Sequence, residues 1–325
     1  MVETTEEPGP TAALRVIYFG TPAFAVPTLR ALLASPHRIV ALVSQPDRPS
    51  GRGQRVAPTA TKQVALEAGV PILQPVKLRD EVFLSTIASY NPDLGVVAAY
   101  GRILPDALLK IPRLGMINVH GSLLPKYRGA APVHRAVIAG EEMTGVTIMR
   151  VVPALDAGPM LATAERPIDP DETSVEVERD LADIGARSLV EVVNQLARGP
   201  IVETPQEDSL ATYAPKLERG ESPIDWERPG REIHNRVRGL QPWPMASTTI
   251  HDVRCLIHRT RLTDDTADVS GGSVIEASGD VLSIATGDRT VLRILMVQPE
   301  GRRAMTTREF LSGRQLNPGM LLGRP

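Results

Sequence analysis

The hydrophobic and polar positions of the first half of the chain alternate between two patterns. Short apolar and β-branched runs that end at turn residues are typical of buried parallel strands, and we predict such strands at residues 14–20, 38–44, 94–99, 116–119 and 146–152. Between them lie stretches with helical spacing, at residues 21–34, 60–68, 80–90, 131–139 and 173–196. This order predicts a Rossmann-like α/β fold, with a mostly parallel sheet and helices on both faces.

The pattern changes after residue 199. Residues 200–222 lack sustained periodicity and carry several turn-forming residues, which is typical of a linker. Five short β-rich runs follow beyond Trp243, separated by glycine and aspartate turns, and indicate a small OB-like β-barrel. We therefore predict a disordered acidic leader at 1–13, an α/β catalytic domain at 14–199, a linker at 200–222 and a C-terminal barrel domain at 223–325.

Composition narrows the classes of protein that the chain can belong to. An apolar fraction of 42% and a charged fraction of 23% are those of a globular protein. The sequence contains no apolar run of 18 residues and no signal-peptide pattern, so we expect no membrane contact and a cytoplasmic location. The single cysteine, Cys255, excludes a disulfide framework. A net charge of −2 gives no support for nucleic-acid binding, so any RNA contact must come from local clusters of basic residues.

Candidate catalytic groups follow the strand predicted at 116–119. Asn118 and His120 are two residues apart and therefore share one face of the strand. An amide donor beside an imidazole suits acyl transfer, in which an oxyanion is held while protons move. Taken alone, such a pair is more often a core histidine with a capping asparagine.

A third candidate follows the next predicted strand. Asp156 precedes the turn Ala157-Gly158, and we expect its carboxylate to lie beside His120 at the same edge of the sheet, where it would orient the imidazole. Taken alone, it is more often a turn residue. An NAD-dependent dehydrogenase is disfavoured, because the first predicted strand leads into Gly20-Thr21-Pro22-Ala23 without a G-x-G-x-x-G motif.

One continuous segment favours the catalytic interpretation of these residues over the purely structural one. Residues 118–132, NVHGSLLPKYRGAAP, closely resemble the signature of the folate-dependent formyltransferases, and residues 155–158, LDAG, resemble that family's second catalytic loop. The resemblance implies a catalytic trio of Asn118, His120 and Asp156. It also implies that tetrahydrofolate binds at Ser122, Leu123, Leu124 and Pro125.

Three further segments resemble the members of this family that act on initiator tRNA. They are residues 45–53 (QPDRPSGRG), residues 96–105 (VVAAYGRILP), and residues 224–226 (IDW) together with 241–245 (QPWPM). By resemblance, the first is a loop that contacts the tRNA acceptor end, with Arg52 at its critical basic position. The family usually carries lysines after the glycines of this loop, whereas this chain has Gln54 and Arg55. Its glycine and proline content leads us to expect no regular structure at residues 48–55.

The resemblance implies a one-carbon transferase. We expect it to move a formyl group from 10-formyltetrahydrofolate to the methionine amino group of initiator methionyl-tRNA, as a monomer and with no metal. A formyltransferase acting on an amino-sugar nucleotide or another small amine is the leading alternative. A glycinamide ribonucleotide formyltransferase, which would lack the barrel, and a non-catalytic RNA-binding module, which would not need the trio, are the others.

Overall fold

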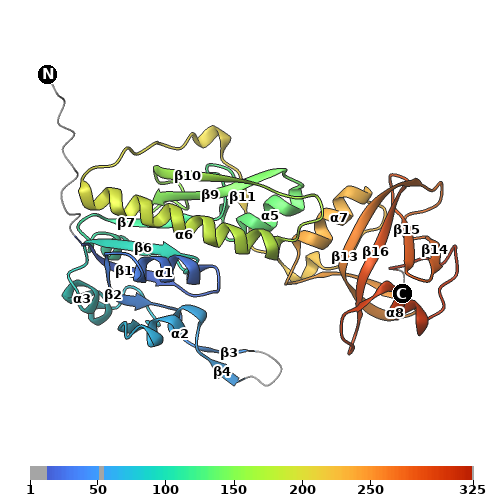
Figure 1. The fold of residues 1–325 in the computed structure, drawn as a ribbon, viewed down its shortest axis with the longest axis horizontal. Helices are drawn as coiled ribbons and strands as arrows, with labels where there is room; N and C mark the ends of the chain where they lie inside the picture. The colour runs from blue at the N-terminus through green and yellow to red at the C-terminus, as the bar shows by residue number, and fades with distance from the viewer. Residues whose placement is uncertain (1–12, 51–54, 324–325) are drawn as a thin grey trace, which may run out of the picture. The chain divides into compact units, whose positions relative to one another are not determined.

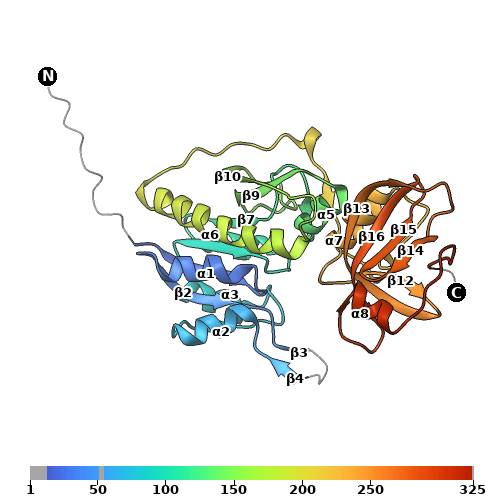
Figure 2. The same cartoon turned by 45° about the vertical axis from the view of Figure 1, so that its right-hand side comes forward.

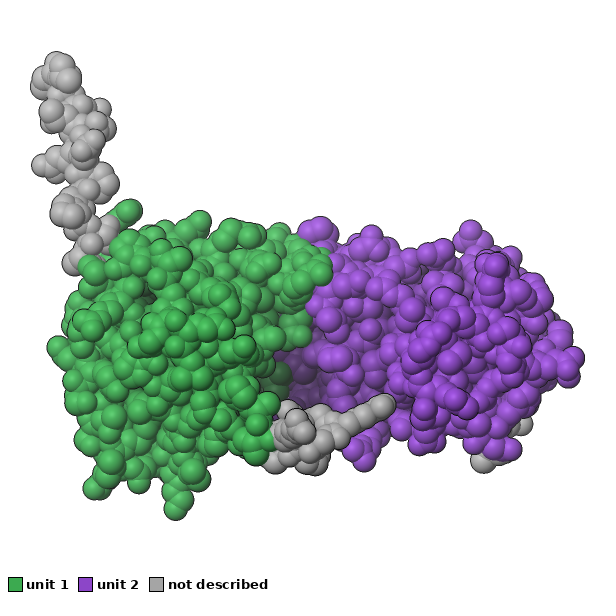
Figure 3. All heavy atoms as spheres, turned by 60° about the horizontal axis from the view of Figure 1, so that its bottom comes forward, with its two compact units in different colours: residues 1–130, 145–166, 178–213 green, residues 131–144, 167–177, 214–325 purple. Residues whose placement is uncertain are grey.

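The computed structural model of the protein describes residues 13–50 and 55–323. Its contacts group into two compact units (Figure 3). Unit 1 comprises Met1–Ala130, Gly145–Arg166 and Glu178–Tyr213, and unit 2 comprises Ala131–Thr144, Pro167–Val177 and Ala214–Pro325. The domain limits expected from the sequence stay a prediction.

Unit 1 is organised by a seven-stranded sheet. In spatial order its strands are β10 (Met160–Pro167), β9 (Met143–Arg150), β7 (Met116–His120), β6 (Leu94–Ala98), β1 (Arg15–Gly20), β2 (Arg38–Val43) and β5 (Ile72–Leu73). The strands from β7 to β5 pair in parallel, whereas β9 is antiparallel to β7. The predicted α/β fold with a mostly parallel sheet is confirmed.

Helices cover both faces of this sheet (Figure 1). They are α1 (Ala25–Leu33), α2 (Ala60–Glu67), α3 (Glu81–Ser89), α4 (Asp106–Leu109) and most of α6 (Ser174–Arg198). Phe19, Val97 and Met116 share a buried cluster with residues of α3 and α4. On the opposite face, the hydroxyl of Tyr18 donates to the carbonyl of Ala25 in α1 at 2.7 Å.

The register of the strands places the candidate residues on a defined face. Phe19 pairs with Val97, and Val97 pairs with Asn118, so all three lie on the face that α3 and α4 cover. His120 follows Asn118 on that face because side chains alternate along a strand. Val119 points the other way, where a Cβ added to Gly185 of α6 would lie 2.9 Å from its side chain.

Two small ribbons stand apart from the main sheet. β3 (Arg48–Ser50) pairs antiparallel with β4 (Arg55–Ala57), and Figure 2 shows both leading away from the sheet. The expectation that residues 48–55 form no regular structure is therefore wrong at residues 48–50 and 55, and residues 51–54 lie outside the described residues. Backbone pairing between Arg48 and Ala57 supplies the order that side-chain patterns do not reveal. The second ribbon joins β8 (Arg128–Gly129) to β11 (Tyr213–Ala214).

Unit 2 contains the predicted barrel and the helices beside it. The helices are α5 (Pro132–Ala139), α7 (Gly230–Gly239) and α8 (Thr307–Ser312). A short 3₁₀ helix lies at Arg219–Glu221 in unit 2, and another lies at Asp208–Leu210 in unit 1. Antiparallel strands follow the order β12 (Ala246–Ile250), β13 (Val253–Thr266), β16 (Thr290–Pro299), β15 (Val281–Ala285) and β14 (Val274–Ser278), and β17 (Met305–Thr306) pairs with β16.

The C-terminal segment closes the barrel between β14 and β12. Gly319 N donates to the carbonyl of Val274 at 2.8 Å, and Gly323 N donates to the carbonyl of Thr249 at 3.0 Å. Leu322 joins the apolar core that also contains Trp226, Ile257 and Phe310. The backbone of this segment thus pairs with both edge strands of the barrel sheet. None of the helices that the structure describes is long and apolar enough to cross a membrane.

Candidate active site

His120 and Asp156 meet in unit 1. His120, at the end of β7, is 5% exposed, and its Nδ1 lies 3.7 Å from Oδ2 of Asp156. Its Nε2 lies 2.9 Å from the carbonyl oxygen of Tyr127. A carbonyl oxygen only accepts, so Nε2 is the donor of this hydrogen bond, which orients the ring. The contact of Nδ1 with Asp156 is longer than a hydrogen bond.

Asp156 reaches His120 by a route that the sequence did not reveal. Because β9 is antiparallel to β7, its last residue, Arg150, pairs with Ile117 near the start of β7. The loop after β9 turns back, and it carries Asp156 to the far end of β7. The expected proximity is found, but the two residues do not follow the ends of parallel strands.

The backbone of this loop is tightly constrained. Asp156 has a φ of 46°, in the left-handed region that non-glycine residues rarely adopt. A Cβ added to Gly158 would lie 1.9 Å from the carbonyl oxygen of Arg150, so only glycine fits. Gly129 N donates to Oδ2 of Asp156 at 2.9 Å. These constraints fix both the backbone of the loop and the position of the Asp156 carboxylate.

Asn118 lies two residues before His120 on the same face of β7 and is half-buried. Within the part of the chain that the structure describes, no hydrogen bond to its side-chain amide is found. A half-buried amide without a partner is costly unless water or a bound molecule satisfies it. Asn118 can therefore donate to a ligand next to His120.

The predicted folate segment, Ser122 to Pro125, follows β7 directly. The hydroxyl of Ser122 donates to the carbonyl of Lys126, and the hydroxyl of Thr147 donates to the carbonyl of Ser122, each at 2.7 Å. Ser122 and Leu124 are buried, whereas Leu123 and Pro125 are half-buried. The segment has a fixed shape, and it offers backbone groups and two apolar side chains to a ligand, whereas the proton of the Ser122 hydroxyl is already donated to Lys126.

Two residues beside the trio were not singled out by the sequence. The side chain of Gln206 donates to the carbonyls of Asp156 and Gly158 and accepts from the guanidinium of Arg128. Arg128 lies inside the segment that resembles the family signature, but no pattern distinguishes it there. Gln206 belongs to the segment predicted as a linker, which carries no periodic signal.

The base of the β3–β4 hairpin is held by a polar network. Lys62 of α2 donates to Asp47 at 2.5 Å and Gln74 donates to Asp47 at 2.7 Å, and these two hydrogen bonds hold the pKa of Asp47 below its usual value. Gln45 donates to the carbonyl of Tyr100 at 2.7 Å. The base is therefore fixed to the main sheet. Arg52, the predicted tRNA contact, lies outside the described residues.

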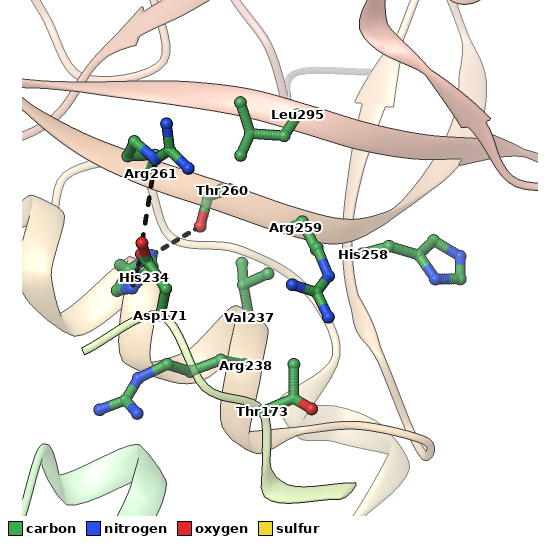
Figure 4. Close-up of a pocket in the computed structure, with 10 residues that line it drawn as sticks. All are labelled: Asp171, Thr173, His234, Val237, Arg238, His258, Arg259, Thr260, Arg261 and Leu295. Atoms are coloured by element: carbon green, nitrogen blue, oxygen red, sulfur yellow. Dashed lines mark hydrogen bonds and ion pairs between the residues drawn. The ribbon is translucent and has the colours of Figure 1, made fainter. Parts of the chain in front are cut away.

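The residues that line a pocket in unit 2 make contacts that hold the structure of this unit together (Figure 4). Nδ1 of His234 lies 2.9 Å from the hydroxyl of Thr260, and its Nε2 lies 2.9 Å from the carbonyl of Pro170. Arg259 pairs with Glu176 at 2.8 Å. Burial lowers the pKa of His234 and favours the neutral ring. These contacts attach residues 167–177 to α7 and β13 within unit 2. Among the described residues, no group of three His, Cys, Asp or Glu could hold a metal ion.

Comparison with known protein families decides the family of the chain. Residues 14–193 match the formyl transferase model, and residues 216–315 match the model of the formyl transferase C-terminal domain. The chain belongs to the formyl transferase family. The family inferred from residues 118–132 is thereby confirmed, and the two matches fall on the α/β and barrel regions of this formyl transferase.

Relatives of this formyl transferase are similar along nearly their whole length. A methionyl-tRNA formyltransferase from Methylococcus capsulatus is 44% identical over 93% of this chain and 98% of its own length. Another, from Thermodesulfovibrio yellowstonii, is 42% identical over 94% of this chain and 97% of its own. The solved N-formyltransferase from Helicobacter canadensis, in complex with folinic acid and dTDP-3-aminofucose, has a TM-score of 0.64 at 15% identity and covers 88% of this chain and 99% of that chain. This last likeness shows the fold alone.

Proposed function

We propose that the protein transfers a formyl group from 10-formyltetrahydrofolate to the amino group of methionine on initiator methionyl-tRNA. The main evidence for the chemistry is that the Asp156 carboxylate lies 3.7 Å from the His120 imidazole. The Asn118 amide lies on the same face of β7 and has no hydrogen-bond partner among the described residues. The choice of acceptor is supported by two relatives, both methionyl-tRNA formyltransferases, whose matches cover nearly the whole chain.

The reaction joins an amine to a formyl carbon. The methionine nitrogen attacks the carbonyl carbon of the formyl group, a C–N bond forms, and negative charge develops on the oxygen. The bond from carbon to N10 of the folate then breaks, and the proton lost by the amine is gained by N10. The acceptor α-amine has a pKa of about 8 or below, so a useful fraction of it is neutral at pH 7.

The trio would act mainly by holding charge and geometry. The Asn118 amide donates to the developing oxyanion, and one well-placed donor of this kind contributes about 3 kcal/mol. The contact between Nδ1 of His120 and Asp156 is longer than a hydrogen bond, so the Nδ1 proton stays available to the formyl oxygen or to a water. The Asp156 carboxylate stabilises the positive charge on the ring. No step requires a metal.

The folate is expected beside the segment Ser122–Leu123–Leu124–Pro125. The backbone there is fixed by Thr147, and the half-buried Leu123 and Pro125 supply apolar surface for a flat ring. Ser122 is expected to contribute through its backbone, because its hydroxyl already donates to Lys126.

Recognition of tRNA is assigned to the barrel and to Arg52. Barrels of this kind are a common nucleic-acid platform, and the pair of Lys62 and Asp47 fixes the chain just before β3, the strand that precedes Arg52 in the sequence. We also propose a monomer acting in the cytoplasm, and sedimentation of the purified protein tests the first of these.

The test is a comparison of acceptors under one set of conditions. The protein is incubated with 10-formyltetrahydrofolate and either charged initiator tRNA or a nucleotide-linked amino sugar, and the products are identified by mass spectrometry. The proposal predicts formylmethionine on the tRNA and no formylated sugar. Formylation of the sugar alone would support the small-amine alternative and overturn the proposal.

A further inference from the structure

The side-chain amide of Gln206 uses all of its hydrogen-bonding capacity beside the active site. Its Nε2 donates to the carbonyl of Asp156 at 2.9 Å and to the carbonyl of Gly158 at 2.7 Å. Its Oε1 accepts from Nε of Arg128 at 3.0 Å and from Nη2 at 2.7 Å. Two N–H groups and two lone pairs are the whole inventory of a primary amide. Its orientation is therefore fixed.

Arg128 holds Gln206 from a buried position. Its side chain is 5% exposed, and Asp208, which it also contacts, is 82% exposed, so the contact with Asp208 contributes little. The planar guanidinium meets the single oxygen of Gln206 with two N–H groups. Such charge-assisted, two-point contacts are the strong class of hydrogen bond.

The neighbours of Arg128 contact the other two members of the cluster. The carbonyl of Tyr127 accepts from Nε2 of His120, and the N–H of Gly129 donates to the carboxylate of Asp156. One segment of three residues thus fixes the imidazole, the carboxylate and Gln206. Gln206 in turn fixes the backbone that carries the carboxylate.

The Asp156 loop depends on such support. A φ of 46° at a non-glycine residue persists only where the surroundings hold it. The two carbonyls that flank Ala157 both accept from Gln206, which clamps the turn at that point. Without the clamp, the carboxylate would leave the position in which it faces His120.

We propose that Gln206, held by Arg128, is a positioning residue for catalysis: it keeps the Asp156 loop in the conformation that places the carboxylate against His120. The inference rests on the proposed function of Asp156. It adds that part of the segment between the α/β and barrel regions supports the active site.

The sharpest test is Gln206→Glu, which keeps the size of the side chain and its contact with Arg128. A carboxylate has no donor, so the carbonyls of Asp156 and Gly158 would face a negative oxygen. Displacement of a catalytic group by about 1 Å can cost on the order of 10²-fold in rate. We therefore expect kcat for initiator methionyl-tRNA to fall by about that factor, with KM values near those of the wild type.

Further variants show whether Gln206 acts through Asp156. In the pair Asp156→Asn and Asp156→Asn/Gln206→Glu, the second change should cause little further loss, because residues that act as a unit are not additive. Arg128→Lys, which replaces the fork by a single ammonium, should lower kcat in the same direction. Gln195→Ala, at an exposed glutamine of α6, is the matched control and should leave kcat unchanged.

The outcomes separate the two proposals. Normal kcat in Gln206→Glu together with a low kcat in Asp156→Asn overturns the clamp and leaves the proposed function intact. Normal kcat in Asp156→Asn overturns the role of Asp156 itself. If Gln206→Glu does not fold, Arg128→Lys is compared alone and combined with Asp156→Asn, and losses that multiply in the combined variant contradict the clamp.

Discussion

The carboxylate of Asp156 lies 3.7 Å from Nδ1 of His120, and the same Oδ2 accepts a hydrogen bond from the backbone N–H of Gly129. The carboxylate is thus held by the backbone while it faces the ring. A negative charge at this position stabilises positive charge that develops on the ring. This relationship supports the first prediction.

Asp156→Asn should lower kcat while it preserves the shape of the loop. The neutral amide no longer stabilises positive charge that develops on the ring, so the dependence of kcat on pH should also change. The measurement is the pH–rate profile of the variant against that of the wild type. An unchanged profile with normal kcat would reduce Asp156 to a turn residue.

Asn118→Ala should remove a donor that acts on the transition state. We expect kcat to fall by about 10²-fold or more, with little change in the binding of folate or tRNA. Single-turnover rates and equilibrium binding of tetrahydrofolate separate the two effects. More than about a third of the wild-type kcat would exclude the oxyanion role.

Gly158→Ala tests the packing of the catalytic loop. The new methyl group would meet the carbonyl of Arg150 at 1.9 Å, and backbone must move to admit it. Overpacking of this kind costs about 1–3 kcal/mol, and activity should fall as the loop shifts. Gly220→Ala is the matched control, because its added Cβ would meet nothing within 4 Å. Equal denaturant midpoints for the two variants would contradict the prediction.

Asp288 makes the stability of unit 2 depend on pH. Burial raises its pKa, but hydrogen bonds from Thr290, Thr286 and the N–H of Gly230 outweigh burial and bring the pKa to about 2. A folded-state pKa below the unfolded value of 3.8 stabilises the protein above pH 3.8, and this stabilisation is lost as the pH falls toward 2. For this exposed group we expect about 1 kcal/mol after solvent screening.

The matching experiment is urea unfolding of Asp288→Asn at pH 7 and near pH 2. The variant should be less stable than the wild type at pH 7, and the difference should shrink at the lower pH. Asp268→Asn, at an exposed aspartate paired with Arg289, is the control. A difference that is the same at both pH values would show that the charge of Asp288 contributes nothing.

Arg52→Ala should impair formylation of tRNA. Loss of a phosphate contact should reduce the salt slope of tRNA binding by about 1. If Arg52 also positions the acceptor end, kcat should fall as well, and Arg52→Lys should restore only part of it. Arg30→Ala, at an exposed arginine of α1 that pairs with Glu67, is the control. Wild-type behaviour of Arg52→Ala at two salt concentrations would leave tRNA recognition to the barrel.

The main sheet was predictable because its strands are apolar on both faces. Strands β1, β2 and β6 are almost wholly buried, so the run of apolar residues marks each of them. β10 was missed because it lies at the edge of the sheet, and its MLATAERP sequence alternates half-buried and exposed positions without an apolar run. The short helix α8 was missed although its cap, formed by Thr306 and Glu309, has a sequence signature.

Site residues could be predicted where a local sequence motif identifies them. They could not be predicted where only the tertiary structure brings distant residues together. Asn118 and His120 share a face because they are two residues apart on one strand. The route of the Asp156 loop depends on the antiparallel direction of β9, which an apolar run does not encode. Gln206 reaches the site from residues without periodicity, since its position is set by hydrogen bonds to Arg128 and the loop.

The most direct test of the account is the single-turnover rate of formyl transfer to initiator methionyl-tRNA, measured for the wild type and for His120→Ala with both substrates saturating. We predict that the wild type converts the tRNA to its formylated form. We expect His120→Ala to do so at least about 10²-fold more slowly, with unchanged affinity for tetrahydrofolate. No formylated tRNA from the wild type, or equal rates for the two proteins, would contradict the account.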